Sequence, residues 1–312
     1  MKLASNLAPA FVASLILATG MVGHAADGGS ILFVGNSFTF GYGSAVHYYR
    51  SQTVTDLNNE GVGGVPALFK VFTEQADLKF DVALETRGGA GIDFHLQNKK
   101  AEIRSRPWDI VVAHGYSTLD QDKPHDPAKL IATSKDLADL VRTSNPKVEL
   151  FLTSTWSRPD QIYPDKGAWA GKPIDVMGKD IRAAYDKAAA AAGAKVVPVG
   201  DAFNRAMQVG FADTNPYDGI DAGKIDLWTY DNYHASTYGY YLEALMVFGR
   251  VTGRDPRSLG GNECSGMELG LSRAEVDKLQ QIAFDELAAT APITPNPKTI
   301  TGRGGASRCP AN

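Results

Sequence analysis

Short runs of apolar residues recur along the chain, and stretches with helical periodicity separate them. The helical stretches cover residues 127–143, 173–192, 237–252 and 273–289. The apolar runs are bounded by Gly, Ser or charged residues and are too short for helices, so each predicts a buried strand. These predicted strands are residues 31–34, 82–84, 110–113, 149–153 and 195–199.

Strands that alternate with helices predict an α/β protein. The continuous apolar character of the strands indicates burial on both faces of a mainly parallel sheet. Right-handed crossovers then give a three-layer α/β/α sandwich of the flavodoxin-like type. In such folds ligands bind at the carboxyl ends of the strands. The loops that start at Gly35, Arg87, His114, Ser154 and Gly200 are therefore expected to form the rim of the site.

The 312 residues are expected to comprise a removable leader, one domain and a tail. Lys2 precedes an apolar stretch, and small residues follow up to Ala25, which predicts a signal peptide at 1–25. An uncleaved anchor is the alternative. Residues 26–291 form the predicted domain, and 292–312, rich in Pro, Gly and Ser, an irregular tail. The signal peptide predicts a secreted or periplasmic protein.

The formal net charge is −4, without a long basic or acidic run, which argues against nucleic acid as a partner. Beyond the leader, no segment has the length and apolar character of a stably inserted membrane span. The two cysteines, Cys264 and Cys309, are expected to form a disulfide in an oxidising compartment, with two buried free thiols as the alternative. Neither has metal-ligand spacing, and no metal site is predicted.

A serine follows the first predicted strand, in Gly35-Asn36-Ser37. Its hydroxyl should face the cleft at the carboxyl end of the sheet, at the start of an expected helix. There its backbone N–H could stabilise a developing oxyanion. A serine in this place could equally just cap that helix.

The second motif is Asp231-Asn232-Tyr233-His234, in a loop before a predicted helix. At this spacing the Asp231 carboxylate can bind one imidazole nitrogen of His234 while the other nitrogen faces a serine hydroxyl. A serine needs such a base to become a good nucleophile. The pair therefore predicts that Ser37, His234 and Asp231 form a catalytic triad.

Together the two motifs resemble the SGNH (GDSL-like) hydrolases, in the variant with Gly-Asn-Ser at the nucleophile. The resemblance continues from His234 through Ser236, Gly239 and Leu242 to Ala244, and it spans roughly residues 30–255. It implies an esterase that forms an acyl-enzyme and needs no cofactor. The strand-to-helix Gly-x-Ser-x-Gly motif of α/β-hydrolases is absent around Ser37.

The resemblance also implies an oxyanion hole that includes the N–H of Ser37. A second family block supplies a glycine N–H, for which we choose Gly89, with Gly88 and Gly91 as neighbouring alternatives. A third block usually supplies an Asn side chain, but here Ser117 stands in its place. Ser117, His114 or a water molecule could be that donor.

The substrate is predicted to be a small-molecule or glycan ester, with a carbohydrate ester slightly favoured over a short-chain or lipid ester. Aromatic residues near the rim favour sugar rings, which stack on aromatic faces. Asn36, Tyr116 and Trp156 are expected to contact the substrate. The altered third block leaves one rival open, a non-catalytic exported glycan-binding module on the same scaffold.

Overall fold

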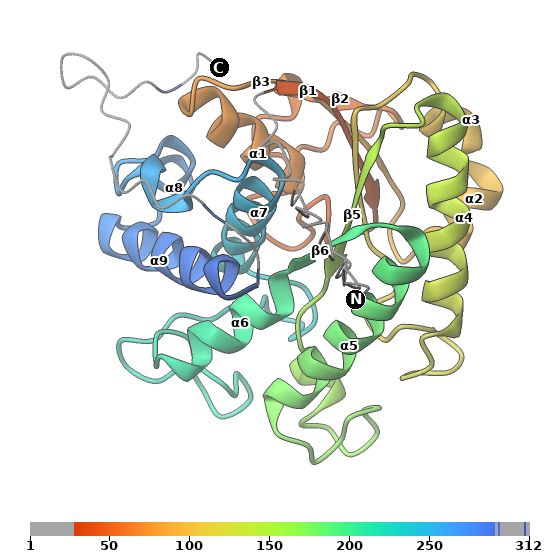
Figure 1. Ribbon diagram of the computed structural model, residues 1–312. Helices are drawn as coiled ribbons and strands as arrows, with labels where there is room; N and C mark the ends of the chain where they lie inside the picture. Colours follow the sequence, from red (N-terminus) through yellow and green to blue (C-terminus); the bar gives the residue numbers. More distant parts are fainter. Residues whose placement is uncertain (1–27, 291–292, 294–308, 310–312) are drawn as a thin grey trace, which may run out of the picture.

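The computed structural model describes residues 28–290 together with residues 293 and 309. The predicted signal peptide, 1–25, lies outside the described residues, as does nearly all of the predicted tail, 292–312. Figure 1 shows the chain from 28 to 290 as helices packed around one central sheet.

All neighbouring strands of the six-stranded sheet run parallel, in the order β2-β3-β1-β4-β5-β6. Without the short β2, the order is that of a flavodoxin-like sheet. The predicted fold class is therefore confirmed. β2 was not predicted, because its two residues, Thr and Asp, carry no apolar run. The strands are β1 Gly28–Gly35, β2 Thr55–Asp56, β3 Lys79–Thr86, β4 Ile110–Ala113, β5 Glu149–Ser154 and β6 Lys195–Pro198.

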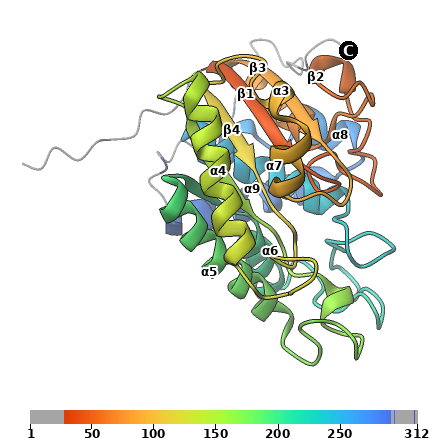
Figure 2. The same cartoon turned by 90° about the vertical axis from the view of Figure 1, so that its right-hand side faces the viewer.

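Helices cover both faces of the sheet, as Figures 1 and 2 show. On one face lie α1 Gly64–Gln75, α6 Val199–Gln208 and α7 Thr237–Thr252, with α9 Arg273–Thr290 packed on α6 and α7. On the other lie α2 Ile92–Asn98, α4 Ala128–Ser144 and α5 Ile174–Ala192. The short helices are α3 Lys100–Ile103 and α8 Cys264–Glu268, with 3-10 turns η1 Ser51–Thr53, η2 Pro159–Gln161 and η3 Pro256–Leu259.

The two apolar cores follow from the alternation of side chains along β1. Ile31 and Phe33 face α1 and α7, whereas Leu32 and Val34 face α2 and α4. Side chains of a strand point alternately to opposite faces, so a run of four apolar residues contributes to both cores. This is why the central strands appear as continuous apolar runs in the sequence.

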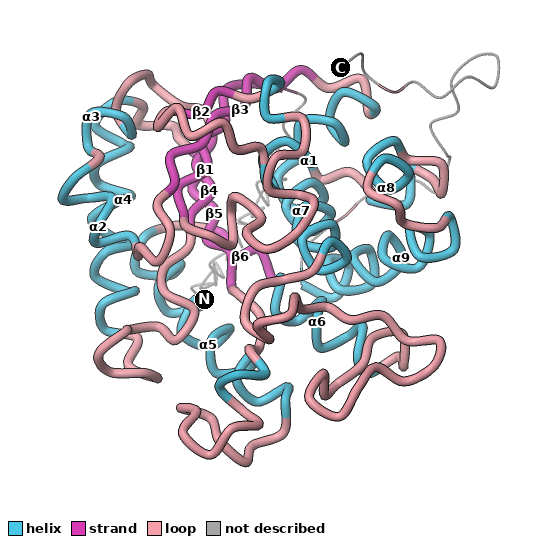
Figure 3. The backbone as a smooth tube through the Cα atoms, turned by 180° about the vertical axis from the view of Figure 1, so that it is seen from behind, coloured by secondary structure: helices cyan, strands magenta, loops and turns pink. Residues whose placement is uncertain are grey.

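The register of the sheet aligns the carboxyl ends of its central strands. Gly35 pairs with Thr86 of β3, and Val34 pairs with Ala113 of β4. The loops that follow β1, β3, β4 and β5 therefore leave the same edge, and Figure 3 shows them as loop segments beyond the strands. The predicted rim is wrong at Gly200, which lies inside α6 because that helix starts directly after β6.

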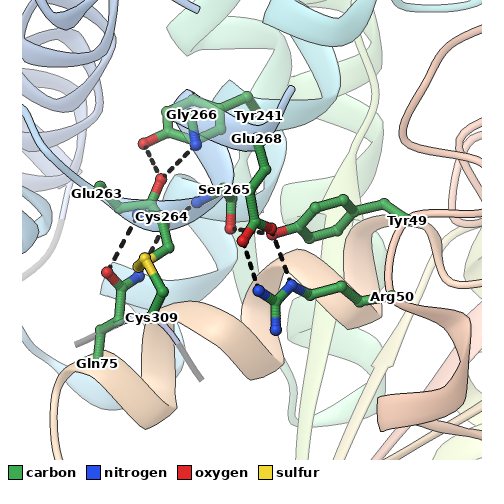
Figure 4. Close-up of a disulfide and its surroundings, with 10 residues drawn as sticks. All are labelled: Tyr49, Arg50, Gln75, Tyr241, Glu263, Cys264, Ser265, Gly266, Glu268 and Cys309. Atoms are coloured by element: carbon green, nitrogen blue, oxygen red, sulfur yellow. Dashed lines mark hydrogen bonds and ion pairs between the residues drawn. A yellow bond between two sulfur atoms is a disulfide. The ribbon is translucent and has the colours of Figure 1, made fainter. Parts of the chain in front are cut away.

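The predicted disulfide between Cys264 and Cys309 is confirmed (Figure 4). It attaches residue 309 to α8, beside α1. Glu263, which precedes α8, is buried, and its carboxylate accepts hydrogen bonds from Gln75 Nε2 at 2.7 Å and Tyr241 Oη at 2.8 Å. These contacts hold the disulfide-bearing turn against α1 and α7.

Candidate active site

Ser37 lies at the carboxyl end of β1, and its side chain is mostly buried, with 7% of the residue exposed. The helix expected after it is absent, because residues 36–50 form successive turns instead. The Ser37 carbonyl accepts hydrogen bonds from the Tyr42 N–H at 3.0 Å and the Tyr240 hydroxyl at 3.3 Å. These bonds fix the serine without a helix dipole behind it.

The structure brings Ser37, His234 and Asp231 together, although 197 positions separate Ser37 from His234 in the sequence. His234 Nε2 lies 2.9 Å from Ser37 Oγ, and His234 Nδ1 lies 2.6 Å from Asp231 Oδ2. With the Nδ1 proton donated to the carboxylate, Nε2 is left to accept the serine proton. This is the geometry that activates a serine hydroxyl.

The other carboxylate oxygen of Asp231 also accepts hydrogen bonds. Asp231 Oδ1 accepts hydrogen bonds from Thr229 Oγ1 at 2.8 Å and from the N–H groups of Tyr233 and His234 at 3.0 and 2.9 Å. Burial raises the pKa of this carboxyl group, but the hydrogen bonds outweigh it and lower the pKa to about 2. Asp231 is therefore ionised at neutral pH.

A tight turn presents these two side chains. Thr229 N donates to the His234 carbonyl at 2.8 Å, and Asn232 takes a left-handed conformation with φ 55°. The next residues start α7, where Ser236 accepts a hydrogen bond from the Gly239 N–H. A Cβ on Gly239 would lie 2.6 Å from the Leu227 carbonyl oxygen. The serine and glycine after His234 thus have structural roles in holding the turn.

Asn36 joins the Ser37 turn to the glycine turn that follows β3. Its Oδ1 accepts from the Phe38 N–H at 3.1 Å, and its Nδ2 donates to the Ala90 carbonyl at 2.8 Å. Sequence reasoning placed Asn36 against the substrate, and it does line the pocket described below. Its amide, however, is already engaged in positioning the two turns.

Gly89 occupies the glycine turn with φ 71°, a left-handed conformation that favours glycine. Its carbonyl accepts a hydrogen bond from Gln121 Nε2 at 3.0 Å. Among residues 28–290, no protein acceptor faces the backbone N–H of either Gly89 or Ser37. Both groups are therefore available as hydrogen-bond donors.

A small polar pocket connects these elements. Asn36, which precedes Ser37, and Tyr233, which precedes His234, both line it. Ser117 lines it as well, and its Oγ accepts a hydrogen bond from Arg158 Nη1 at 2.9 Å. The remaining lining residues are Gly89, Tyr116, Thr118, Gln121 and Arg158. The structure thus places Gly89, Ser117 and Tyr116, all selected from the sequence, around one space.

Two of the sequence-based candidates are placed elsewhere. Trp156 has no exposed surface and is stacked on Phe38 and Phe203, so it does not line the pocket as predicted. Its indole N–H donates to the Tyr233 carbonyl at 3.2 Å and so supports the turn that carries His234. Its ring packs in the apolar core between Phe38 and Phe203, which explains its burial.

His114, an alternative third oxyanion donor, is buried with both ring nitrogens engaged. Nε2 lies 2.9 Å from Thr39 Oγ1, and Nδ1 lies 3.1 Å from the Gly115 carbonyl oxygen. Burial lowers the pKa of His114 to about 4, so the ring is neutral at pH 7. Neither nitrogen is left to donate to a substrate.

A second pair of a histidine and a carboxylate lies outside the proposed triad. His95 and Glu85 are both fully buried, with His95 Nδ1 2.5 Å from Glu85 Oε2.

Among the described residues, no group of three or more His, Cys, Asp or Glu side chains could hold a metal ion. Likewise, within the part of the chain that the structure covers, no helix is long and apolar enough to cross a membrane.

Sequence reasoning missed Arg158 and Tyr42. Tyr42 lies in the turns after Ser37, and its ring centroid is 4.8 Å from that of His234. Arg158 follows β5 in a loop that the strand pattern did place on the rim, and that position was the only available signal. Its contact with Ser117 joins loops 41 residues apart.

Comparison with solved structures identifies the fold. A DUF4886 family protein from Bacteroides uniformis superposes with a TM-score of 0.59 at 18% identity, covering 86% of this chain and 98% of that one. A protein from Parabacteroides merdae, assigned as a GDSL-like lipase, gives a TM-score of 0.52 at 16% identity, covering 74% and 98%. The chain has the SGNH hydrolase fold.

The likeness is one of structure, since no protein-family model matches the sequence and no curated protein matches it. In this SGNH fold the serine turn, the glycine turn and the histidine turn meet at the carboxyl edge of the sheet.

Proposed function

We propose that this chain is an exported serine esterase that hydrolyses acyl esters through an acyl-enzyme. The observation that carries the proposal is the hydrogen-bonded series Ser37 Oγ, His234, Asp231, with contacts of 2.9 and 2.6 Å. A loop serine that only capped a turn would not need an imidazole that a carboxylate orients toward its hydroxyl.

In the first half of the proposed cycle, Ser37 Oγ attacks the ester carbonyl carbon while His234 Nε2 takes the hydroxyl proton. The carbonyl oxygen becomes an oxyanion that accepts from the N–H groups of Ser37 and Gly89 and from the Ser117 hydroxyl. His234 then gives its proton to the leaving alcohol as the carbon–oxygen bond breaks. In the second half, water attacks the acyl-enzyme, with His234 again as the base, and the acid leaves. No cofactor takes part.

The pocket favours a short acyl group. Its walls carry amide, hydroxyl, guanidinium and backbone groups rather than aliphatic side chains. A long fatty acyl chain would leave these polar groups unsatisfied when it displaced water.

The surface beside His234 favours a carbohydrate as the alcohol. Tyr42, whose ring lies against His234, is 44% exposed, and Tyr230, whose side chain interacts with that of Tyr42, is 81% exposed. Since His234 protonates the leaving alcohol, that alcohol must lie near these rings. Exposed aromatic faces next to a polar site suit the apolar face of a sugar ring.

Turnover of p-nitrophenyl acetate, together with labelling by a fluorophosphonate probe and peptide mapping, tests the proposal. An esterase releases p-nitrophenol and is labelled on Ser37. A non-catalytic glycan-binding module on this scaffold would give neither signal, and a label on another serine would reject Ser37 as the nucleophile.

Export is part of the proposal and is supported by the disulfide, which is typical of oxidising compartments. Amino-terminal sequencing of the protein recovered outside the cytoplasm should begin at Ala26. Recovery with Met1 intact would contradict the cleavage after Ala25.

A further inference from the structure

We propose that Arg158 is a positioning residue that turns the Ser117 hydroxyl into an oxyanion donor. The inference rests on the esterase function proposed above. It addresses one difference from the family pattern, in which Ser117 stands where an asparagine usually supplies the third donor. An asparagine amide carries its own fixed N–H groups, whereas a serine hydroxyl rotates and can point its proton elsewhere.

The hydrogen bond between Arg158 and Ser117 has a fixed direction. Arg158 Nη1 lies 2.9 Å from Ser117 Oγ, and a guanidinium can only donate. The serine oxygen is therefore the acceptor, and its own proton must point away from Arg158. Ser117 is 7% exposed and lines the same pocket as Gly89, so that proton has the pocket to donate into.

Arg158 is itself held in place by two further contacts. Its Nε and Nη2 atoms donate to the two carboxylate oxygens of Asp160 at 2.9 and 2.5 Å. The guanidinium carbon lies 3.5 Å from the centroid of the Tyr233 ring. A planar guanidinium that is both bidentate and stacked has little freedom to leave Ser117.

These contacts also connect Arg158 to the turn that carries the proposed triad residues. Asp160 N donates to the Asn232 carbonyl at 3.2 Å, and Tyr233 directly precedes His234. One set of contacts therefore fixes Arg158 relative to the same turn that carries Asp231 and His234. A positive group bonded to the serine oxygen also makes its proton a stronger donor as charge develops on the substrate.

A double-mutant cycle tests the proposal, with Ser117→Ala, Arg158→Met and the double variant assayed on p-nitrophenyl acetate. Loss of an oxyanion donor should lower kcat by about tenfold or more in Ser117→Ala, with KM nearly unchanged. Arg158→Met should lower kcat by a similar factor, because the hydroxyl becomes free to rotate. In the Ser117→Ala background, Arg158→Met should then cause little further loss.

The matched control is Arg257→Met. Arg257 likewise pairs with an aspartate two positions away, Asp255, and stacks on an aromatic ring, Phe284, at 3.3 Å. It lies beyond the carboxyl end of α7, the helix whose amino end adjoins the His234 turn. Arg257→Met should leave kcat unchanged, and thermal unfolding of all variants checks that they fold.

The outcomes separate the inference from the function. Equal losses from Arg158→Met in both backgrounds would mean that Arg158 acts independently of Ser117. Unchanged kcat in both single variants would mean that the Ser117 hydroxyl is not an oxyanion donor. Either result overturns the inference about Arg158, whereas turnover by the wild-type protein would still support the proposed esterase function. If Arg158→Met fails to fold, Arg158→Leu, which also removes the donor, takes its place in the cycle, and Arg158→Lys, which keeps a donor, should retain more kcat than Arg158→Leu. A wild-type protein without turnover would reject the function and the inference together.

Discussion

Asn36 Nδ2 donates a hydrogen bond to the carbonyl oxygen of Ala90 at 2.8 Å, and this bond links the turns that follow β1 and β3. Ser37 is on one of these turns and Gly89 is on the other. This buried amide, together with the hydrogen bond from the Arg87 N–H to the Gly35 carbonyl at 3.0 Å, therefore sets the distance between the proposed nucleophile and the proposed oxyanion donor.

Replacing Asn36 with aspartate should disturb this link. Asn36→Asp keeps the acceptor for the Phe38 N–H but sets a carboxylate oxygen against the Ala90 carbonyl. Displacement of the glycine turn should lower kcat by about tenfold to a hundredfold on p-nitrophenyl acetate. Asn145→Asp is the control, since Asn145 also accepts from the N–H two positions on and donates to a distant carbonyl, that of Trp108. The control should lose stability but keep kcat, and equal kcat in both variants would contradict the role of Asn36.

The three residues of the proposed triad should act as a unit. Ser37→Ala and His234→Ala should each lower kcat by at least about a thousandfold, and the double variant should be little worse than either. Asp231→Asn should lose less, because the N–H contacts to residue 231 remain to hold the turn. Steady-state kinetics and circular dichroism measure activity and fold. Esterase activity that survives in Ser37→Ala would falsify the assignment of the nucleophile.

His114 should make stability depend on pH below neutrality. Its pKa is lowered from 6.5 to about 4 in the folded protein, so between these values the unfolded chain binds a proton that the folded chain does not. Stability should therefore be full above pH 6.5 and fall as the pH drops to 4. A shift of this size corresponds to roughly 3 kcal/mol.

Denaturant unfolding at several pH values measures this effect. His114→Gln should flatten the decline between pH 6.5 and 4, since the group that titrates is gone. His125→Gln is the control, because His125 is exposed, and this variant should keep the wild-type slope. A His114→Gln protein with the full wild-type slope would assign the pH dependence to another group.

The disulfide should stabilise the domain by attaching residue 309. Cys264 and Cys309 are 45 positions apart, and a loop of that size corresponds to about 3 to 4 kcal/mol in chain-entropy estimates. Cys309→Ser should lower the free energy of unfolding by this amount. Reduction of the disulfide in the wild-type protein should lower it by the same amount. Two alkylatable thiols in the native, non-reduced protein would disprove the pairing in solution.

Sequence reasoning succeeded where the physical signal is local. Strands buried on both faces appear as apolar runs, and the Asp231 to His234 spacing is fixed within one turn. It failed for α1, which is buried on nearly all sides and has no clear polar face, and for α6, which follows β6 without a loop.

In the site, too, residues in local motifs could be predicted, and contacts between distant loops could not. Ser37, Asp231 and His234 belong to short motifs, so their types and order could be recognised before their distances were known. The Arg158 contact with Ser117 depends on two loops that adjacent strands β4 and β5 bring together, and no spacing encodes it. Trp156 was misplaced because an aromatic residue after a strand can point to the rim or into the core with equal ease.

The exposed ring of Tyr230 should contribute to binding of a sugar alcohol and not to the chemical step. Tyr230→Ala should raise KM for an acetylated oligosaccharide by about twofold to tenfold, the range of a single aromatic stacking contact. It should leave kcat/KM for p-nitrophenyl acetate nearly unchanged, because that small ester is too short to need the Tyr230 ring beside Tyr42. Tyr230→Phe, which keeps the ring, should bind the oligosaccharide almost as the wild type does. Tyr217→Ala is a surface control, since Tyr217 is 48% exposed but packs on Tyr163 instead of lying near His234. If Tyr230→Ala lowered activity on both substrates equally, the tyrosine would support the catalytic turn and the carbohydrate preference would lose its basis.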